Sequence, residues 1–422
     1  MKILGIWDGH DSGAAIVIDG SVAVAVNEER LSRRKLEIRF PSQSILTCLS
    51  EAGMEASDLH AVAYSTTDVA KTIARVYPES KERYYAIRRR KCLPGRMSNA
   101  QKQLKYWLTL WPGNRLTRCI GEAAIRRELR RIGFGDSRLV AIEHHAAHAS
   151  AAAHCSPFPS CTVVTIDGLG DGLSSTVSRY TDGRMERVAE SPAGHSLGIF
   201  FEHVTNLLNM RELEDEGKVM ALSTFAYPIA AEDNPLMDFF RVRDARLIAR
   251  YGPFEMYRQL RRVLWQYPAE QFAFMAQQAL EHHATSLVRQ AVGLTGEARV
   301  AYSGGVASNI RANARIRECP EVEELFVFPH MGDGGLAVGA AIAADKEGGA
   351  NRPAGIEQIY WGPCESAPPE ALPAHVRQRS FATLEELLSE AAARLASDEI
   401  LLWYQSRMEF GPRALGHRSI LA

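Results

Sequence analysis

The sequence predicts an α/β fold in which one unit of strands and turns occurs twice. Residues 3–29 and residues 161–190 both read as strand, Asp-Gly turn, strand, Asp-Gly turn, strand. Val, Ile and Thr favour strands, and Asp-Gly suits a two-residue hairpin because glycine accepts the positive φ of such turns. Helical stretches follow each copy, so strands and helices are mixed in both halves.

The duplication predicts two similar lobes that face each other across a cleft. The chain has 422 residues, of which 46% are hydrophobic, which is enough for more than one core. Paired units that open with an acidic turn are the arrangement of actin-like (ASKHA) ATPases and sugar kinases, in which the turns grip phosphate or metal. We expect lobes at about 1–160 and 161–345. Chance similarity between two hairpins is the alternative.

The remaining segments of these lobes have simpler patterns. Residues 66–135 and 235–294 read as mainly helical, and Glu281, His282 and His283 fall within the second stretch, where surface or packing roles are expected. Residues 299–318 and 325–344 each read as a strand, a Gly-rich turn and a helix. A helix that begins after such a turn presents free N–H groups, which suit phosphate.

A basic segment, residues 81–96, lies between the two copies. It contains seven basic residues with Tyr84 and Tyr85 interleaved: Lys81, Arg83, Arg88, Arg89, Arg90, Lys91 and Arg96. A solvated helix face is one interpretation, and a patch for an anionic substrate is the other.

The C-terminal region predicts a separate and incomplete domain. Residues 346–356 resemble a linker, and residues 357–422 contain a helix at 384–396 and a strand at 400–405. About 60 residues are marginal for an independent core. At the other end the chain begins with a strand pattern and not with a signal peptide, so we expect a cytoplasmic protein.

Composition excludes several classes of partner. The formal net charge of −1 argues against a general binder of nucleic acids or membrane surfaces. No stretch reaches the roughly 20 apolar residues that span a bilayer. The seven cysteines form no CxxC pair, which indicates reduced thiols and not a disulfide or zinc framework.

A pair of histidines predicts a divalent-metal site. His144 and His148 occur in the run EHHAAHA, where small residues favour a helix and place both on one face. His145 points elsewhere. Imidazole pairs need further ligands, and Asp167 and Asp333 in the acidic turns are the candidates. Ordinary buried histidines are the alternative.

Three other positions carry candidate chemistry. His10 lies between Asp8 and Asp11, where an imidazole can act as a base towards a hydroxyl, although a locally bonded turn histidine fits equally well. Lys218 follows Gly217 and is either a phosphate contact or a surface lysine, since the Walker spacing is missing. Arg413 and Arg418 in the GPRAL segment suit an anion grip.

Taken in order, these motifs resemble those of the O-carbamoyltransferases of nodulation-factor and antibiotic biosynthesis. The matching runs are HDSGAAIVIDG with NEERLSRRK, EHHAAHA, DGLGDG, EGKVMALS, SGGVASN, MGDGG and EFGPRALGHRSIL. The resemblance spans essentially the whole chain and is specific for the family, but it says little about the acceptor.

The resemblance implies a fold and a reaction. Residues 1–345 would form an actin-like domain, shared with the tRNA threonylcarbamoyladenosine enzyme, and residues 357–422 the start of an α/β carbamoyl-adenylating domain. Family members use carbamoyl phosphate and ATP to make carbamoyl-adenylate. The actin-like domain then transfers the carbamoyl group to a hydroxyl of a small molecule, such as a sugar or natural product.

The resemblance also implies roles for individual residues. An iron(II)-type metal, with zinc, manganese or magnesium as alternatives, would be held by His144, His148, Asp167 and Asp333. Asp8 and His10 would be the acid and base beside the acceptor hydroxyl. The nucleotide would face Gly217, Lys218, Ser303, Gly304, Gly305 and Asn309, and Arg413 and Arg418 would bind an anion.

One departure from the family pattern limits these expectations. The family continues beyond GPRALGxRSI with most of the adenylating domain, whereas this sequence stops at Ala422. We therefore expect a C-terminally truncated member, or a chain completed by a second polypeptide or a homodimer. Two functional alternatives remain: another actin-like sugar kinase or ATPase, and a transfer domain that is inactive without a partner chain.

Overall fold

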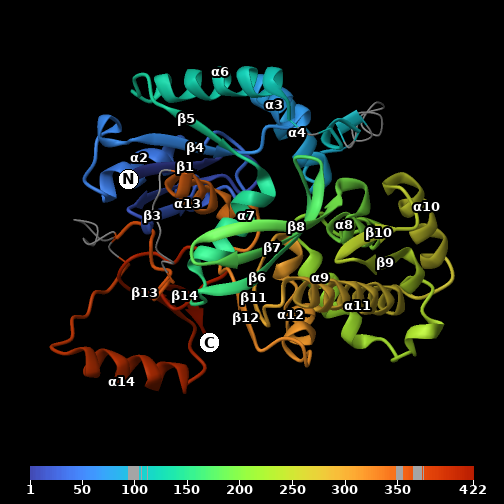
Figure 1. Ribbon diagram of the computed structural model, residues 1–422. Helices are drawn as coiled ribbons and strands as arrows, with labels where there is room; N and C mark the ends of the chain where they lie inside the picture. Colours follow the sequence, from blue (N-terminus) through green and yellow to red (C-terminus); the bar gives the residue numbers. More distant parts are fainter. Residues whose placement is uncertain (94–103, 106, 112, 348–354, 365–372, 374) are drawn as a thin grey trace.

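The first lobe is built on a five-stranded sheet. The computed structural model describes residues 1–93, 104–105, 107–111, 113–347, 355–364, 373 and 375–422. Three strands form an antiparallel meander and two more run parallel to the first of them, in the order β3-β2-β1-β4-β5 (Figure 1). These strands are β1 (Lys2–Trp7), β2 (Gly13–Ile18), β3 (Ser21–Asn27), β4 (Ala61–Ser65) and β5 (Leu139–Ile142).

The second lobe repeats this topology. Its sheet has the order β12-β11-β6-β7-β8, again a meander followed by two parallel strands. The strands are β6 (Ser160–Gly170), β7 (Leu173–Thr181), β8 (Arg184–Pro192), β11 (Arg299–Ser303) and β12 (Glu324–Val327). The same strand order in both sheets confirms the duplicated, actin-like α/β fold class.

One predicted turn is displaced along the chain. The predicted hairpin turns at Asp19-Gly20 and Asp182-Gly183 are present, and all four of these residues have positive φ. The turn predicted at Asp167-Gly168 is not, because β6 continues through these residues with an irregular register and turns at Asp171-Gly172. The bulge aims Asp167 at the cleft instead of into the sheet ladder.

Helices cover the outer faces of both sheets. In the first lobe α2 packs on the meander through Ile45 and Cys48, and α6 contributes Ile125 to the same core. The helices of this lobe are α1 (Glu28–Ser32), α2 (Ser42–Glu51), α3 (Val69–Val76), α4 (Pro78–Arg88) and α6 (Arg115–Arg131). The last three of these helices, α3, α4 and α6, agree with the helical character predicted for residues 66–135. Part of that range lies outside the described residues.

The second lobe is wrapped around one long helix. α11 buries Phe272, Leu280 and Leu287 in the largest core. Within residues 235–294, predicted to be helical, there is also a hairpin of β9 (Phe240–Arg243) and β10 (Arg246–Ala249). The helices are α8 (Leu197–Leu207), α9 (Glu216–Leu222), α10 (Pro253–Leu264), α11 (Ala269–Thr295) and α12 (Ile310–Arg317). His283 donates from Nε2 to the Met237 carbonyl at 3.0 Å, as expected of a packing residue.

Two small-residue helices lie between the sheets (Figure 1). These are α7 (His144–Cys155) and α13 (Leu336–Glu347). Glycines allow their close contacts: a Cβ on Gly339 would lie 2.0 Å from the Ala147 carbonyl oxygen, and one on Gly5 would lie 1.9 Å from that of Ala337. α13 therefore packs on the first sheet, although its sequence falls within the expected second lobe, 161–345.

The C-terminal part returns to the first lobe. It contains α14 (Leu384–Leu395) and a two-stranded sheet of β13 (Leu401–Tyr404) and β14 (Arg418–Leu421). Ile400, Leu402 and Ile420 are at least 70% exposed. Most of the expected linker, 346–356, lies outside the described residues.

Among the described helices, none combines the length and apolar character needed to cross a membrane.

Candidate active site and metal centre

Helix α7 positions both histidines at the cleft. Its N-cap is Glu143, whose carboxylate accepts hydrogen bonds from the backbone N–H groups of His145 and Ala146 at 2.9 and 3.0 Å. The rings of His144 and His148 are one turn apart, with centroids separated by 4.8 Å. His145 points to the second sheet instead, where Nδ1 lies 2.7 Å from the Thr165 hydroxyl.

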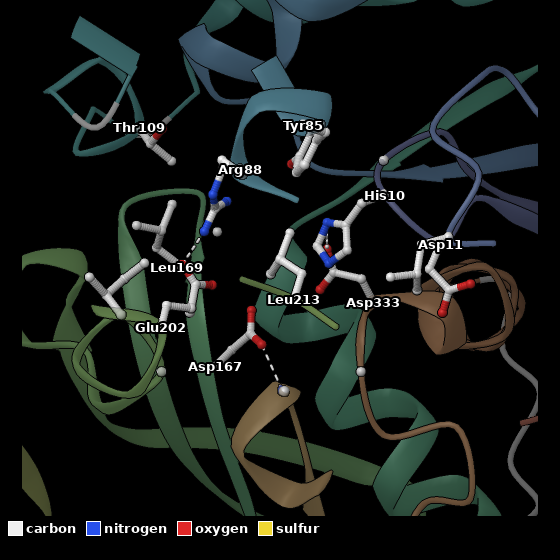
Figure 2. A pocket seen from close by; sticks show the side chains of 18 of the residues that line it. His10, Asp11, Tyr85, Arg88, Thr109, Asp167, Leu169, Glu202, Leu213 and Asp333 are labelled. Carbon is white, nitrogen blue, oxygen red and sulfur yellow. Dashed lines mark hydrogen bonds and ion pairs between the residues drawn. The ribbon is translucent and has the colours of Figure 1, made fainter. Parts of the chain in front are cut away.

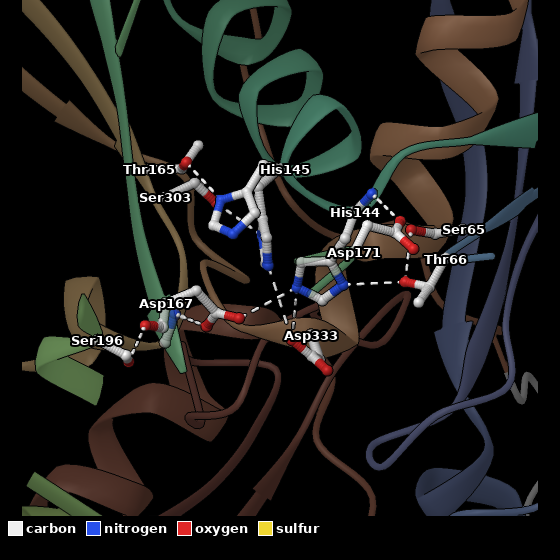
Figure 3. A network of polar contacts seen from close by, with 12 residues as sticks. Ser65, Thr66, His144, His145, Thr165, Asp167, Asp171, Ser196, Ser303 and Asp333 are labelled. Carbon is white, nitrogen blue, oxygen red and sulfur yellow. Dashed lines mark hydrogen bonds and ion pairs between the residues drawn. The ribbon is translucent and has the colours of Figure 1, made fainter. Parts of the chain in front are cut away.

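Two aspartates reach these histidines from different elements (Figure 3). Asp167 sits at the bulge of β6, with Oδ2 3.0 Å from Nε2 of His144, and its Oδ1 accepts a hydrogen bond from the Gly305 N–H at 2.6 Å. Asp333 lies just before α13, and its Oδ1 is 3.7 Å from Nε2 of His144 and 3.6 Å from Nε2 of His148.

The four side chains have the arrangement of a metal site. One ligand atom from each of His144, His148, Asp167 and Asp333 lies within 4.8 Å of the other three. Nε2 of His148 is buried and has no hydrogen-bond partner among the described residues. A buried polar nitrogen without a partner costs free energy of folding unless a ligand binds it. The set of two imidazole nitrogens and two carboxylate oxygens therefore fits a divalent ion with mixed ligands.

Two side chains of this cluster, Asp167 and His144, are held in their charged forms. Burial alone would raise the pKa of Asp167, but the hydrogen bond to His144 and the charge of neighbouring imidazoles hold that pKa well below its usual range. Burial likewise opposes protonation of His144, but the carboxylates of Asp333 and Asp167 raise its pKa to about 9. Two buried carboxylates this close together are stable only if a positive charge lies between or beside them.

His10 stands beside the candidate metal ligands in the turn after β1 (Figure 2). Its Nδ1 lies 3.4 Å from Oδ2 of Asp333, and its ring centroid is 5.6 Å from that of Tyr85. The Trp7 indole N–H donates to the His10 carbonyl at 2.7 Å and fixes this turn. Burial, aided by nearby arginines, lowers the pKa of His10 to about 4, so the ring is neutral at pH 7.

Asp8 is placed differently from its neighbour His10. Arg75 donates to both carboxylate oxygens of Asp8 at 2.9 and 3.1 Å, and Nζ of Lys71 lies 2.8 Å from Oδ1. Against the effect of burial, Arg75 and Lys71 hold the pKa of Asp8 well below its usual range. Asp8 is not among the residues that line the cavity.

A cavity of about 800 Å³ opens above the candidate metal ligands, between the two lobes. Of the six residues predicted to face a nucleotide, Gly217, Gly305 and Asn309 line it. Asn309 also caps α12 and bonds Gln277.

The other three residues predicted to face a nucleotide have different surroundings. Ser303 and Gly304 are buried beneath the cavity wall, where Gly304 passes close to the Ile166 carbonyl. Lys218 points outwards: its side chain is 71% exposed and pairs with Asp215 at 2.7 Å.

The two C-terminal arginines have unlike surroundings. Arg413 approaches α9, since a Cβ on Gly217 would lie 3.8 Å from its Nη2. Arg418 donates to the backbone carbonyls of Gln405, Ser406 and His417, and it stacks 3.4 Å over the Tyr404 ring. These bonds hold β13 to β14, and anion binding by Arg413 and Arg418 stays a prediction.

The basic segment links the lobes, which neither sequence interpretation anticipated. Arg88 on α4 pairs with Glu202 of α8 (Figure 2). It also pairs with Glu212 at 2.5 Å, and both glutamates belong to the second lobe. Lys91 pairs with Glu214 at 3.0 Å. Arg96 lies outside the described residues. The acidic partners are more than 100 residues away in sequence, so local charge patterning could not reveal them.

Comparison with known families gives two matches. The model of the carbamoyltransferase N-terminus matches residues 2–342, and that of the carbamoyltransferase C-terminus matches residues 392–422. The first contains every metal-ligand candidate together with His10.

Curated relatives agree with these matches. The nodulation protein NolNO of Sinorhizobium fredii is 30% identical over 98% of this chain and 58% of its own length. Nodulation protein NolO of Bradyrhizobium diazoefficiens is 33% identical over 67% of this chain and 53% of its own length. The chain thus spans between half and two thirds of these two relatives.

Among solved structures, component A of the (R)-2-hydroxyglutaryl-CoA dehydratase of Acidaminococcus fermentans aligns with a TM-score of 0.45 and 16% identity. The alignment covers 83% of this chain and all of that chain. The assignment of the fold rests on the strand order and not on this distant likeness.

Proposed function

The chain belongs to the carbamoyltransferase family, and from this premise we propose that it transfers a carbamoyl group to a hydroxyl of a small molecule. The observation that carries the proposal is that a candidate base and a candidate metal site lie together at one cavity. His10, a neutral imidazole, stands 3.4 Å from Asp333, which belongs to the buried set of two histidines and two aspartates.

We propose that His144, His148, Asp167 and Asp333 hold a divalent metal, with iron(II) the first candidate and zinc, manganese and magnesium the alternatives. When bound, such an ion neutralises charge that develops on a phosphate oxygen. The chain positions the ligands itself: the hydroxyl of Thr66 lies 3.0 Å from Nδ1 of His144, so both nitrogens of that ring are engaged.

In the proposed step the acceptor oxygen attacks the carbamoyl carbon of carbamoyl-adenylate. The bond from that carbon to the phosphate oxygen breaks, and AMP leaves with the electron pair. With Nδ1–H directed at Asp333, Nε2 of His10 takes the proton of the attacking hydroxyl. A base in this position accelerates such reactions by roughly 10²–10⁴-fold.

Asp8 fits a positioning role in this scheme. Its ionised carboxylate is enclosed by Arg75 and Lys71, so it has no proton to donate. The acid function inferred from the family resemblance is therefore replaced in our proposal by an ion pair that anchors the turn carrying His10.

The nucleotide part of the donor would lie against the second lobe, where Gly217, Gly305 and Asn309 line the cavity. We propose that carbamoyl-adenylate is formed from carbamoyl phosphate and ATP by the C-terminal domain of the family, whose model matches residues 392–422.

The test supplies the chain directly with carbamoyl-adenylate labelled with ¹³C in the carbamoyl group and with a panel of sugar hydroxyls. We expect a ¹³C-carbamate and AMP from the wild type. His10→Asn should bind AMP with unchanged affinity and lose transfer by about 10²-fold or more. The control, His282→Asn, changes a histidine on the exposed side of α11 and should retain full activity.

The same assay separates the alternatives. Full transfer by His10→Asn would remove His10 from the proposed reaction. In a parallel reaction with ATP in place of carbamoyl-adenylate, phosphorylation of the sugar from the γ-phosphate would identify a kinase. Transfer that appears only after a separately produced adenylating domain is added would identify a module that depends on a partner chain.

A further inference from the structure

Positive charge is concentrated on the first-lobe side of the cavity. Three cations converge on Asp8: Arg75 and Lys71 pair with its carboxylate, and Nζ of Lys81 donates to its backbone carbonyl. One carboxylate cannot balance three cations. Lys71 and Lys81 both line the cavity, so the surplus charge faces the space where a substrate would lie.

Lys81 and Lys105 have no carboxylate partner of their own. Among the described residues, neither ammonium group forms an ion pair. Lys105 rests on aromatic rings instead, with Nζ 3.9 Å from the centroid of Tyr84 and 4.6 Å from that of Tyr85. Burial and the charge of Arg88 lower the pKa of Lys105 to about 7, and burial together with Lys71 holds the pKa of Lys81 well below its usual range. A lysine whose pKa is lowered in this way loses its proton more readily, and an anion bound beside it would favour the charged form.

Nearby acidic groups do not remove the surplus. Asp68 lines the cavity, but its carboxylate caps α3 by accepting the Lys71 N–H at 2.6 Å, and burial raises its pKa. Glu79, at the start of α4, also lines the cavity but is exposed. Lys81 and Lys105 at the buried end of this wall are therefore available to an anionic ligand.

The lysines lie one aromatic ring away from the proposed chemistry. Nζ of Lys71 lies 4.0 Å from the centroid of the Trp7 ring, and that ring also contacts His144, with centroids 5.8 Å apart. Lys105 stands over Tyr85, whose ring centroid is 5.6 Å from that of His10. A molecule whose hydroxyl reaches His10 can thus place a second group, a few atoms away, against these ammonium groups.

We propose that Lys71, Lys81 and Lys105 form an anion-binding subsite that selects a hydroxyl acceptor bearing a phosphate or carboxylate group. The proposal rests on the proposed function and names its substrate class. All three lysines belong to the first lobe, on α3, on α4 and in the segment before α6. The donor's nucleotide was assigned to the opposite wall, with Gly217, Gly305 and Asn309, so the lysines are left for the acceptor.

Binding can be tested without the reaction. Glucose 6-phosphate and glucose are titrated calorimetrically into the metal-loaded chain that is saturated with AMP, so that the donor side is filled. We expect glucose 6-phosphate to bind and glucose to bind at least tenfold more weakly. Lys81→Met and Lys105→Met should each lower the affinity for glucose 6-phosphate by about tenfold, because each removes one charged hydrogen-bond donor.

Two further variants keep this test decisive. Lys81→Arg retains the charge and should bind within about threefold of the wild type. Lys346→Met removes a lysine at the far end of α13 and should change nothing. Equal affinity for glucose and its phosphate, or unchanged affinity in both methionine variants, would overturn the subsite.

The source of the anion is tested by competition. One outcome is that AMP displaces glucose 6-phosphate and that Lys81→Met lowers the affinity for AMP as much as that for glucose 6-phosphate. The lysines would then hold the donor's phosphate, and the acceptor proposal would be wrong. Because no carbamoyl group moves in this experiment, its result is independent of the transfer assay with His10→Asn. A chain that transfers carbamoyl groups equally well to both sugars would refute the subsite while leaving the proposed function intact.

Discussion

The hydroxyl of Ser303 lies 3.3 Å from Nδ1 of His148 and 3.0 Å from the carbonyl oxygen of Met331. Since a carbonyl only accepts, the one hydroxyl proton is directed at Met331, and the Ser303 oxygen accepts from Nδ1–H of His148. This contact fixes the tautomer of His148 and leaves Nε2, the atom that faces Asp333, with a free lone pair. Ser303, predicted to contact nucleotide, is thus a support for the proposed metal ligand.

Replacing Ser303 by alanine should weaken metal binding by about 10–100-fold, the usual effect of losing a hydrogen bond behind a ligating histidine. Competition with a chromogenic chelator measures the affinity. Ser308→Ala is the matched control, because its hydroxyl lies on the cavity rim and donates to the Gly305 carbonyl. Equal metal affinity in the two variants would contradict the assignment of Ser303.

Loading the chain with iron(II) under anaerobic conditions should raise its Tm, and a chelator should reverse the change. An ion that binds only the folded state adds about 2.7 kcal/mol at 100 times its Kd. Asp333→Asn should lose most of this gain, because it removes a charged ligand from the set. A Tm that responds equally in Asp333→Asn and wild type would show that the ion binds elsewhere.

Gly304→Ala should destabilise the protein strongly. Gly304 has φ +100°, and a Cβ there would lie 2.3 Å from the Ile166 carbonyl oxygen. Both the backbone strain and the clash oppose alanine, at a cost of roughly 1–3 kcal/mol for the strain alone. Gly293→Ala, inside α11 with open space around its Cβ, should instead stabilise by about 0.5–1 kcal/mol. Urea unfolding of both variants checks the contrast, which would fail if Gly304→Ala unfolded like wild type.

The duplicated fold could be predicted because its signals are local. β-branched runs and Asp-Gly pairs specify the two meanders within 30 residues each, and the spacing of His144 and His148 specifies a shared helix face. The structure then brings both predicted aspartates to those histidines, Asp167 from the bulge of β6 and Asp333 from the turn before α13. Their binding of a metal remains a prediction.

The rest depends on contacts between distant parts of the chain. Nothing in the sequence of α13 shows that it packs on the first sheet, since its alanines and glycines would suit either lobe. Arg75 was not singled out, because an arginine on a short helix has no pattern that announces Asp8 as its partner. The turn at Asp171 was missed because the run DGLGDG contains two Asp-Gly pairs, at 167–168 and 171–172, that local propensity cannot rank.

Asp8→Asn should reveal whether Asp8 acts through charge in the fold or as a proton donor. The change leaves Arg75 and Lys71 buried without their counter-charge and should cost about 3–5 kcal/mol of unfolding free energy at pH 7. The folded-state pKa of Asp8 is depressed, so its contribution is complete above its unfolded pKa of about 4 and is lost as the pH falls towards the folded value. Urea unfolding curves of wild type and variant should therefore differ at pH 7 and begin to converge only as the pH falls below about 4. A variant as stable as wild type at pH 7 that lost only carbamoyl transfer would instead restore the role of acid.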